Sequence, residues 1–172
     1  MKKFIPTQEE LNNILKMYNE ELLGSQTISE KTGISKPTIL RILKENGVPD
    51  DFKYLAVAES GLRHVNSPSG AASTWQIMKA TGQGYGLLIN EELDERYHIE
   101  KSTHAACKYL NEAYLKYGNW TLAAASYNMG MAGIQGKINE QLEDNYYNLW
   151  PNQETSRYVF RIIALKEVLQ NP

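Results

Sequence analysis

A glutamate at the end of an apolar segment is the first residue of this sequence whose setting suggests chemistry. Glu59 follows the run Leu55–Ala58 and precedes a loop of small residues that ends in the pair Trp75-Gln76. A carboxylate at the edge of a core costs desolvation free energy unless it is paired or used. Apolar surroundings raise the pKa of a carboxyl group because they disfavour its charged form. The sequence therefore predicts an acid that can keep its proton near neutral pH.

The elements that must position Glu59 are helices, because apolar residues recur at helical spacing over most of the chain. After residue 48 we expect helices over about 50–59, 74–81, 101–117, 119–128 and 154–169, with a weaker one near 133–143. Ser102 is expected to cap the third of these helices, and the segments 82–97 and 129–136 are expected to be loops. No segment alternates with period two for long enough to predict a strand. The fold class is therefore all-α, mainly helical.

The composition excludes several classes of protein. The chain has 172 residues, 42% of them hydrophobic, which suits one domain or one domain with a small appendage. Its net charge of -2 points neither to nucleic acid nor to an anionic membrane. The single cysteine, Cys107, excludes an internal disulfide and is expected to be a small buried residue. The three histidines lack the spacing of a zinc helix, so we expect no metal.

The start of the chain and its apolar runs bear on where the protein is expected to be found. No apolar stretch follows the basic N-terminal residues, and no run approaches the roughly 18 apolar residues of a membrane span. The sequence as written is therefore expected to be soluble and cytoplasmic, or to be an excised or fused piece of a longer protein.

The composition changes near Gly47, which predicts a segment 1–47 and a domain 48–172. The stretch SQTISEKTGISKPTILRILKENG, residues 25–47, has the layout of a helix-turn-helix. Over roughly residues 7–47 the chain resembles the DNA-binding helix-turn-helix of recombinases and small regulators, which implies DNA as a partner. Residues 1–48 carry a net charge of only +1, from seven Lys/Arg and six Asp/Glu, so a plain supporting hairpin is the alternative. The side chains able to reach phosphates or base edges are Lys36, Thr38, Arg41 and Lys44.

Four separated blocks of sequence follow residue 46. They are, in order, AVAESGL around Glu59, NSPSGAASTWQIM, AAASYNMG and ETSRYV. Together they resemble the soluble lytic transglycosylase domain, a lysozyme-like family that cleaves bacterial peptidoglycan, and within it the membrane-bound transglycosylase D-like branch. One block alone would be weak, because Glu-Ser-Gly is a common tripeptide, but four in order on a helical background are specific. They cover roughly residues 46–170, about three quarters of the chain.

The resemblance implies a lysozyme-like fold and a mechanism with one carboxyl group and no cofactor. Glu59 would protonate the bond between N-acetylmuramic acid (MurNAc) and N-acetylglucosamine (GlcNAc), helped by the 2-acetamido group of the substrate. It would then take a proton from the carbon-6 hydroxyl, so that a 1,6-anhydro ring forms. Most glycosidases need a second carboxylate, and Asp94 and Glu95 lie in a loop outside the four blocks. The resemblance implies substrate contacts from Ser60, Ser67, Gln76, Tyr127, Asn128 and Tyr158.

Several alternatives remain open at this stage. The chain could be a DNA-binding helix-turn-helix protein carrying a degenerate lysozyme-like domain, or a hydrolytic muramidase that uses water. The family implies the periplasm or cell envelope, whereas no export signal is present. The pair Ser73-Thr74 replaces the glycine and large apolar residue usual in the family, which could re-polarise the floor of a cleft. The aromatic residues that could stack on sugars, or instead pack in the core, are Trp75, Tyr85 and Trp120.

Overall fold

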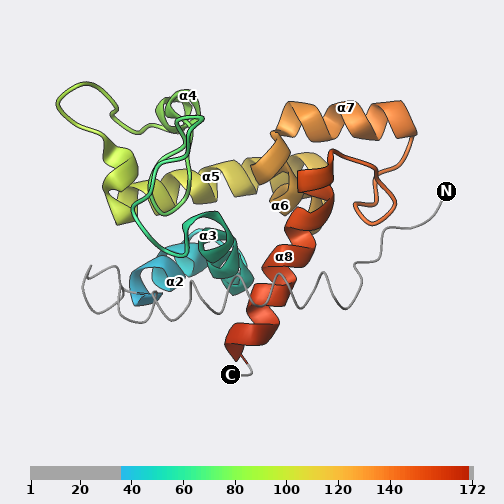
Figure 1. Ribbon diagram of the computed structural model, residues 1–172, viewed down its shortest axis with the longest axis horizontal. Helices are drawn as coiled ribbons and strands as arrows, with labels where there is room; N and C mark the ends of the chain where they lie inside the picture. The colour runs from blue at the N-terminus through green and yellow to red at the C-terminus, as the bar shows by residue number, and fades with distance from the viewer. Residues whose placement is uncertain (1–35, 171–172) are drawn as a thin grey trace. The chain divides into compact units, whose positions relative to one another are not determined.

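The structure is a computed structural model that describes residues 36–170 (Figure 1). These residues contain no β-strand, only three isolated bridges, so the prediction of an all-α fold is confirmed. The elements are α2 (Lys36–Glu45), η1 (Asp50–Phe52), α3 (Lys53–Ser60), α4 (Lys79–Gly84), η2 (Glu95–Tyr97), α5 (Ile99–Tyr117), α6 (Trp120–Met129), α7 (Met131–Gln141) and α8 (Gln153–Gln170).

The described residues form two compact units, 36–109 and 110–170, and the boundary falls within α5. In the unit 36–109, α2 and α3 both contact η1. The α2 residues Ile39, Ile42 and Leu43 are buried, as is nearly all of α3. The core of this unit also contains the fully buried Trp75, whose indole N–H donates to Thr103 Oγ1 at 2.8 Å. Trp75 is therefore a core residue and not a sugar-stacking face.

Cys107 lies on the buried side of α5 in the same unit. Burial raises the pKa of its thiol to about 12 because the thiolate would lose its hydration. The expectation of a small buried residue is thus confirmed, and the thiol is held in its unreactive, protonated form.

In the unit 110–170, α6 packs against both α7 and α8 (Figure 1). Asn119 starts α6 as its N-cap, because its side-chain oxygen accepts from the Leu122 N–H at 2.8 Å. All of Leu122–Ser126 is buried, which explains why this helix is rich in alanine: small side chains allow two helices to approach it closely. Buried side chains from α7 and α8 complete the core, among them Ile134, Tyr158 and Leu165.

Three local expectations from the sequence are wrong. The helix expected over 74–81 begins only at Lys79, because Ser73 and Gln76 adopt positive φ angles of 66° and 46° that a helix excludes. Ser102 does not cap α5, which begins at Ile99, so Ser102 lies within the helix. Most of the loop expected over 129–136 belongs to α7. Of the helix-turn-helix expected over residues 25–47, the part 25–35 lies outside the described residues.

Candidate active site

Helix α3 is mostly buried, but Glu59 near its C-terminal end is partly exposed. Residues Tyr54–Ala58 and Ser60 are buried, whereas Glu59 is partly exposed. The helix ends immediately after it at Gly61, which has the left-handed angles φ 62° and ψ 28° and donates its N–H to Val57 O at 2.8 Å. Glycine suits this position because it has no Cβ to clash in that conformation. Glu59 is thus the only carboxylate of α3 and lies at its last turn.

Ser60, the neighbour of Glu59, fastens α3 to the loop that follows. Its hydroxyl is buried and donates to Thr74 O at 2.8 Å. A buried hydroxyl that is already bonded to the backbone costs no unsatisfied polar group. The structure therefore places this predicted substrate-contact residue inside the protein, where it sets the distance between α3 and the loop.

The loop 65–77 carries the next two predicted site residues. Isolated bridges join Ala72 to both Asn66 and Ile77, so the loop folds back on itself. Gln76 donates from its amide nitrogen to Val65 O at 2.8 Å and to Ser73 O at 2.7 Å. Both amide hydrogens are thereby used, and the side-chain oxygen is its remaining polar atom. The positive φ of Gln76 is uncommon for a residue with a side chain, and such backbone strain concentrates at functional sites.

Ser67, at the other end of this loop, shapes a turn. Its hydroxyl accepts from the Ala71 N–H at 3.0 Å and lies 2.9 Å from the Ser69 hydroxyl. Ser67 as a whole is half-buried.

The pair Ser73-Thr74 is fully buried, so neither hydroxyl is presented to solvent. The Ser73 hydroxyl lies 2.6 Å from His64 Nδ1, which ties an exposed imidazole to the buried part of the loop. Thr74 Oγ1 is buried and has no hydrogen-bond partner among the described residues. The replacement of the usual glycine and large apolar residue by Ser73-Thr74 therefore affects the packing of the loop.

Arg96 holds the loop from outside. Its guanidinium donates to Gly70 O at 2.9 Å and to Ile77 O at 3.1 Å. It also donates to the Asp94 carboxylate at 2.6–3.1 Å. The hydrogen bond from Arg96 holds the pKa of Asp94 below its usual value. The hydrogen bond from Lys101, with another from the Leu88 N–H, likewise lowers the pKa of Glu95. The two carboxylates considered as second catalytic groups are thus engaged in ion pairs that shape the loop.

Asp94→Asn is expected to destabilise the protein by about 2 kcal/mol at pH 7, because it leaves the largely buried Arg96 without its charge-assisted partner. The folded-state pKa of Asp94 lies below the ordinary 3.8, so the carboxylate contributes stability above that value. This contribution is lost as the pH falls through the folded pKa. Urea unfolding of both proteins from pH 7 down to pH 2 measures the difference, which should shrink in acid. Asp144→Asn, at an exposed carboxylate, should change stability little at any pH.

The unit 110–170 contains the remaining predicted residues, Tyr127, Asn128 and Tyr158. Asn128 lies at the end of α6, where its oxygen accepts from Thr155 Oγ1 at 2.6 Å and its nitrogen donates to Glu154 Oε1 at 2.9 Å. Both partners belong to the first turn of α8, so Asn128 joins the two helices. Tyr127 beside it is half-buried, and Tyr158 is buried on α8.

Glu154 and Thr155 were not among the predicted site residues. Their signal was available, since both belong to the ETSRYV block that drew attention to Tyr158. Their contact with Asn128 could not be predicted from the sequence, because no sequence pattern indicates that the end of α6 contacts the start of α8.

Each of the two remaining candidates for stacking on a sugar, Trp120 and Tyr85, packs against another aromatic ring of its own unit. Trp120 stacks on Tyr114 with ring centroids 4.3 Å apart and an interplanar angle of 20°. Tyr85 meets Tyr109 edge to face at 5.7 Å. These contacts are of the kind that stabilise packing, and both Trp120 and Tyr85 remain partly exposed.

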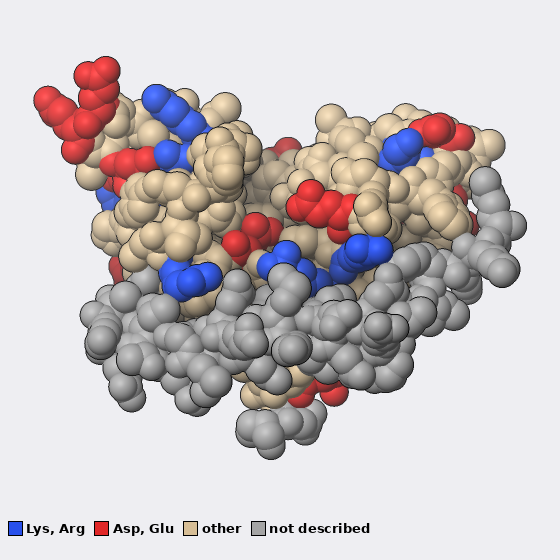
Figure 2. Space-filling view, viewed as in Figure 1, with Lys and Arg blue, Asp and Glu red and all other residues tan. Residues whose placement is uncertain are grey.

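The candidate DNA-contacting residues lie on α2. Arg41 is exposed, but its guanidinium binds Glu45 at 2.8 Å and Glu100 at 2.9 Å. Lys44 and Thr38 lie on the same helix, and the side chain of Lys36 lies outside the described residues. Over the described part of the face in Figure 2, basic and acidic side chains are interspersed. A role of this helix in binding DNA stays a prediction.

Comparison with known proteins identifies the family. The family model of the Transglycosylase SLT domain matches residues 37–149, which is more than half of the chain. The chain belongs to this family. The match begins at residue 37, within α2. The expected division into a segment 1–47 and a domain 48–172 stays a prediction. Glu59, Gln76 and Asn128 all fall within the matched segment.

Two curated relatives of this SLT domain come from Escherichia coli. The membrane-bound lytic murein transglycosylase D of strain K12 is 30% identical over 139 residues, which cover 75% of this chain and 30% of the relative. The protein of the same name from strain O6:H1 matches equally. The chain thus spans about a third of the length of the curated relatives it matches. No helix among residues 36–170 is long and apolar enough to cross a membrane.

A solved structure is also similar to the SLT chain. It is an inactive glutamate-to-glutamine mutant of the lytic transglycosylase Slt from Pseudomonas aeruginosa, with a TM-score of 0.65 and 19% sequence identity. The match covers 98% of this chain and 32% of that one. At this identity the likeness shows the fold, and it confirms the expected lysozyme-like, all-α architecture of lytic transglycosylases.

Proposed function

We propose that this protein is a peptidoglycan lytic transglycosylase that cleaves the MurNAc–GlcNAc glycosidic bond without water. The observation that carries the proposal is membership of the SLT family together with a single carboxylate, Glu59, at the exposed end of a buried helix. The other acids near the loop, Asp94 and Glu95, are engaged in ion pairs, which favours a mechanism with one acid.

In the first step Glu59 donates its proton to the glycosidic oxygen, and the bond from the MurNAc carbon-1 to that oxygen breaks. The 2-acetamido group of the substrate stabilises the positive charge that develops at carbon-1. In the second step the Glu59 carboxylate takes the proton of the carbon-6 hydroxyl, whose oxygen bonds to carbon-1. One proton is given and one is recovered, so the enzyme is regenerated and the product carries a 1,6-anhydro ring.

The loop 65–77 supports this chemistry from the same unit. Gln76 offers its side-chain oxygen as an acceptor, and Ser67 offers a hydroxyl, both suited to the amide and hydroxyl groups of amino sugars. Ser60 acts as a positioning residue, because its hydroxyl holds the loop against α3. This rigidity matters, since a displacement of about 1 Å can cost two orders of magnitude in rate.

The unit 110–170 is proposed to supply Tyr127, Asn128 and Tyr158. Asn128 fixes the end of α6 to α8 and so sets the direction of Tyr127, the hydroxyl of which can stabilise charge during cleavage. Tyr158 is buried at 3% exposure, so we assign it to supporting this end of α8 more than to touching substrate.

Analysis of the reaction products tests the proposed reaction. Purified peptidoglycan is incubated with the full chain, and the released muropeptides are weighed by mass spectrometry. We expect anhydro products, which are lighter than the hydrolysed ones by the mass of one water molecule. Reducing ends would instead identify a hydrolytic muramidase, and the absence of any release would contradict both enzymatic readings.

The glycan strands of peptidoglycan are accordingly the proposed partner. Because peptidoglycan lies outside the cytoplasm, the proposed place of action is the cell envelope, in keeping with the name of the Escherichia coli relatives as membrane-bound murein enzymes.

A further inference from the structure

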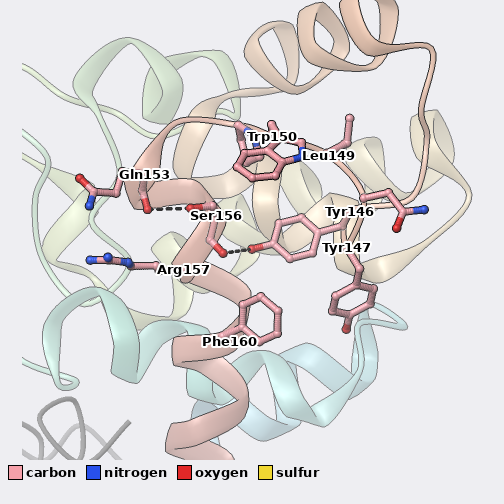
Figure 3. Close-up of a pocket in the computed structure, with 10 residues that line it drawn as sticks. Tyr146, Tyr147, Leu149, Trp150, Gln153, Ser156, Arg157 and Phe160 are labelled. Atoms are coloured by element: carbon pink, nitrogen blue, oxygen red, sulfur yellow. Dashed lines mark hydrogen bonds between the residues drawn. The ribbon is translucent and has the colours of Figure 1, made fainter. Parts of the chain in front are cut away.

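A pocket of about 420 Å³ opens in the unit 110–170, between the segment 146–151 and the first turns of α8 (Figure 3). Four of the ten residues around it are aromatic, and Arg157 is the only charged one among them. The pocket lies within one unit and includes none of the residues assigned above to the reaction. Its volume falls in the range of small-molecule sites.

The helical period of α8 places Tyr158 outside the group of residues that line the pocket. The α8 residues that line the pocket are Gln153, Ser156, Arg157 and Phe160. Their spacing i, i+3, i+4, i+7 places them within an arc of about 100° around the helix, with Gln153 and Arg157 toward one edge of the arc and Ser156 and Phe160 toward the other. Tyr158 is buried and points elsewhere, because two residues from Ser156 along a helix correspond to a rotation of about 200°.

The aromatic wall of the pocket is rigid. Tyr146 is buried, and its hydroxyl donates to Thr155 O at 2.8 Å and to Ser156 O at 3.1 Å. Burial raises the pKa of this hydroxyl to about 12, so it remains a donor at all physiological pH values. Phe160 lies 6.2 Å from the Tyr146 ring, measured between centroids. Figure 3 shows the rings of Tyr146, Trp150 and Phe160 on one side of the α8 turn, with Gln153 and Arg157 on the other.

Two large aromatic side chains at the rim are exposed to water. Trp150 and Tyr147 are each 49% exposed, although their neighbours Tyr146 and Leu149 are buried. The backbone of Trp150 is nevertheless held, since its N–H donates to Gln141 Oε1 at 2.8 Å and its carbonyl accepts from Gln141 Nε2 at 3.0 Å. A fixed backbone presenting exposed rings is an arrangement suited to a ligand with a flat apolar face.

We propose that this pocket is a second saccharide-binding site, formed by residues other than those assigned to cleavage, which holds a GlcNAc-containing strand. A pyranose ring has an apolar C–H face that stacks on an aromatic ring, and a polar edge that needs amides, hydroxyls and guanidinium groups. The lining of the pocket contains both kinds of group: the exposed rings of Trp150 and Tyr147, and, across the α8 turn from the rings, the polar ends of Gln153 and Arg157. The lack of acidic residues in its lining also suits a strand that carries lactyl or peptide carboxylates.

The second site rests on the proposed function in one respect, namely that the substrate is a long polymer. A strand held at one point has a raised effective concentration at another, so a weak second contact increases residence on an insoluble wall. The same contact adds nothing for a fragment too short to reach both sites.

The inference is tested with the full chain carrying Glu59→Gln, so that cleavage does not consume the ligand. A GlcNAc tetramer is titrated into it, and the indole N–H resonance of Trp150 is followed by NMR after assignment with Trp150→Phe. We expect a saturable shift of this resonance, and Tyr147→Ala should weaken the affinity it reports about tenfold. A Trp150 resonance that stays still at saturating tetramer overturns the proposal.

A second measurement separates this inference from the proposed function. The double variant Trp150→Ala/Tyr147→Ala is made in the chain that keeps Glu59. It should release products from short soluble strands at the normal rate but bind insoluble peptidoglycan about tenfold less well. Leu142→Ala, at an apolar side chain that is 92% exposed in the same unit, is the matched control and should behave as wild type. Equal binding of the insoluble wall by all variants overturns the second site. Failure of the wild type to release any products contradicts the proposed function. In that case the titration with the GlcNAc tetramer still decides whether the second site exists.

Discussion

Glu59→Gln should lower the release of anhydro-muropeptides by at least about a thousandfold, which is within the range of general acid–base catalysis. The amide is close in size and shape to the protonated acid, so the last turn of α3 and the Gly61 cap are retained. It can neither give a proton to the glycosidic oxygen nor take one from the carbon-6 hydroxyl. Product release from purified peptidoglycan, quantified by mass spectrometry over time, measures the effect.

Two further variants make this result specific. Glu92→Gln removes an exposed carboxylate from the loop of the same unit and should leave the rate unchanged. Glu59→Asp keeps a carboxyl group but shortens the side chain by one methylene. It should therefore retain a small activity, above that of Glu59→Gln. The one-acid mechanism would be wrong if Glu59→Gln released anhydro products at a rate near that of wild type. The solved relative from Pseudomonas aeruginosa, described as an inactive glutamate-to-glutamine mutant, makes this the natural substitution to test.

Trp75→Ala should destabilise the protein by about 3–5 kcal/mol, the usual cost of removing a large aromatic side chain from a core. Trp75 is fully buried, and its indole N–H is the partner of the buried Thr103 hydroxyl. The variant therefore leaves a cavity and also removes a hydrogen bond that joins the loop 65–77 to α5. Thermal unfolding followed by circular dichroism should show a midpoint lowered by about 10 °C.

A graded pair of variants separates packing from hydrogen bonding at this position. Trp75→Phe keeps most of the apolar volume but loses the N–H, and should cost clearly less than Trp75→Ala. Trp150→Ala removes a tryptophan that is half-exposed, and should shift the midpoint by little. A small effect of Trp75→Ala would contradict the assignment of this residue to the core.

The long helices were predictable because their stabilisation is local and periodic. The segment expected over 101–117 is α5, which starts two residues earlier, and the segment expected over 154–169 is α8 with one more residue at each end. Both carry apolar residues on a continuous stripe, which fixes the helical period whatever the stripe packs against. The start of α5 was misplaced at Ser102, because a serine that could cap a helix is equally able to bond to a carbonyl within one, as it does to Ile99 O at 3.3 Å.

The segment 74–81 was not predictable in the same way. Its residues have no strong preference against helix, and the conformation is decided by contacts distant in sequence. Trp75 enters the core to meet Thr103, and Arg96 binds the carbonyls of Gly70 and Ile77. These contacts offset the backbone strain at Ser73 and Gln76, which local propensity alone would have avoided.

The helical class, the family and the one carboxylate that an apolar helix brings to the surface could be predicted from the residues alone. They follow from periodicity and from short blocks whose residues lie next to one another along the chain. The packing of the helices, by contrast, settles that Ser60 faces the interior, that Asn128 binds the start of α8 and that an aromatic pocket lies beside α8. A hydrogen bond depends on distances in space, and residues 14–27 positions apart, such as Ser60 and Thr74 or Asn128 and Thr155, meet only once the helices have packed.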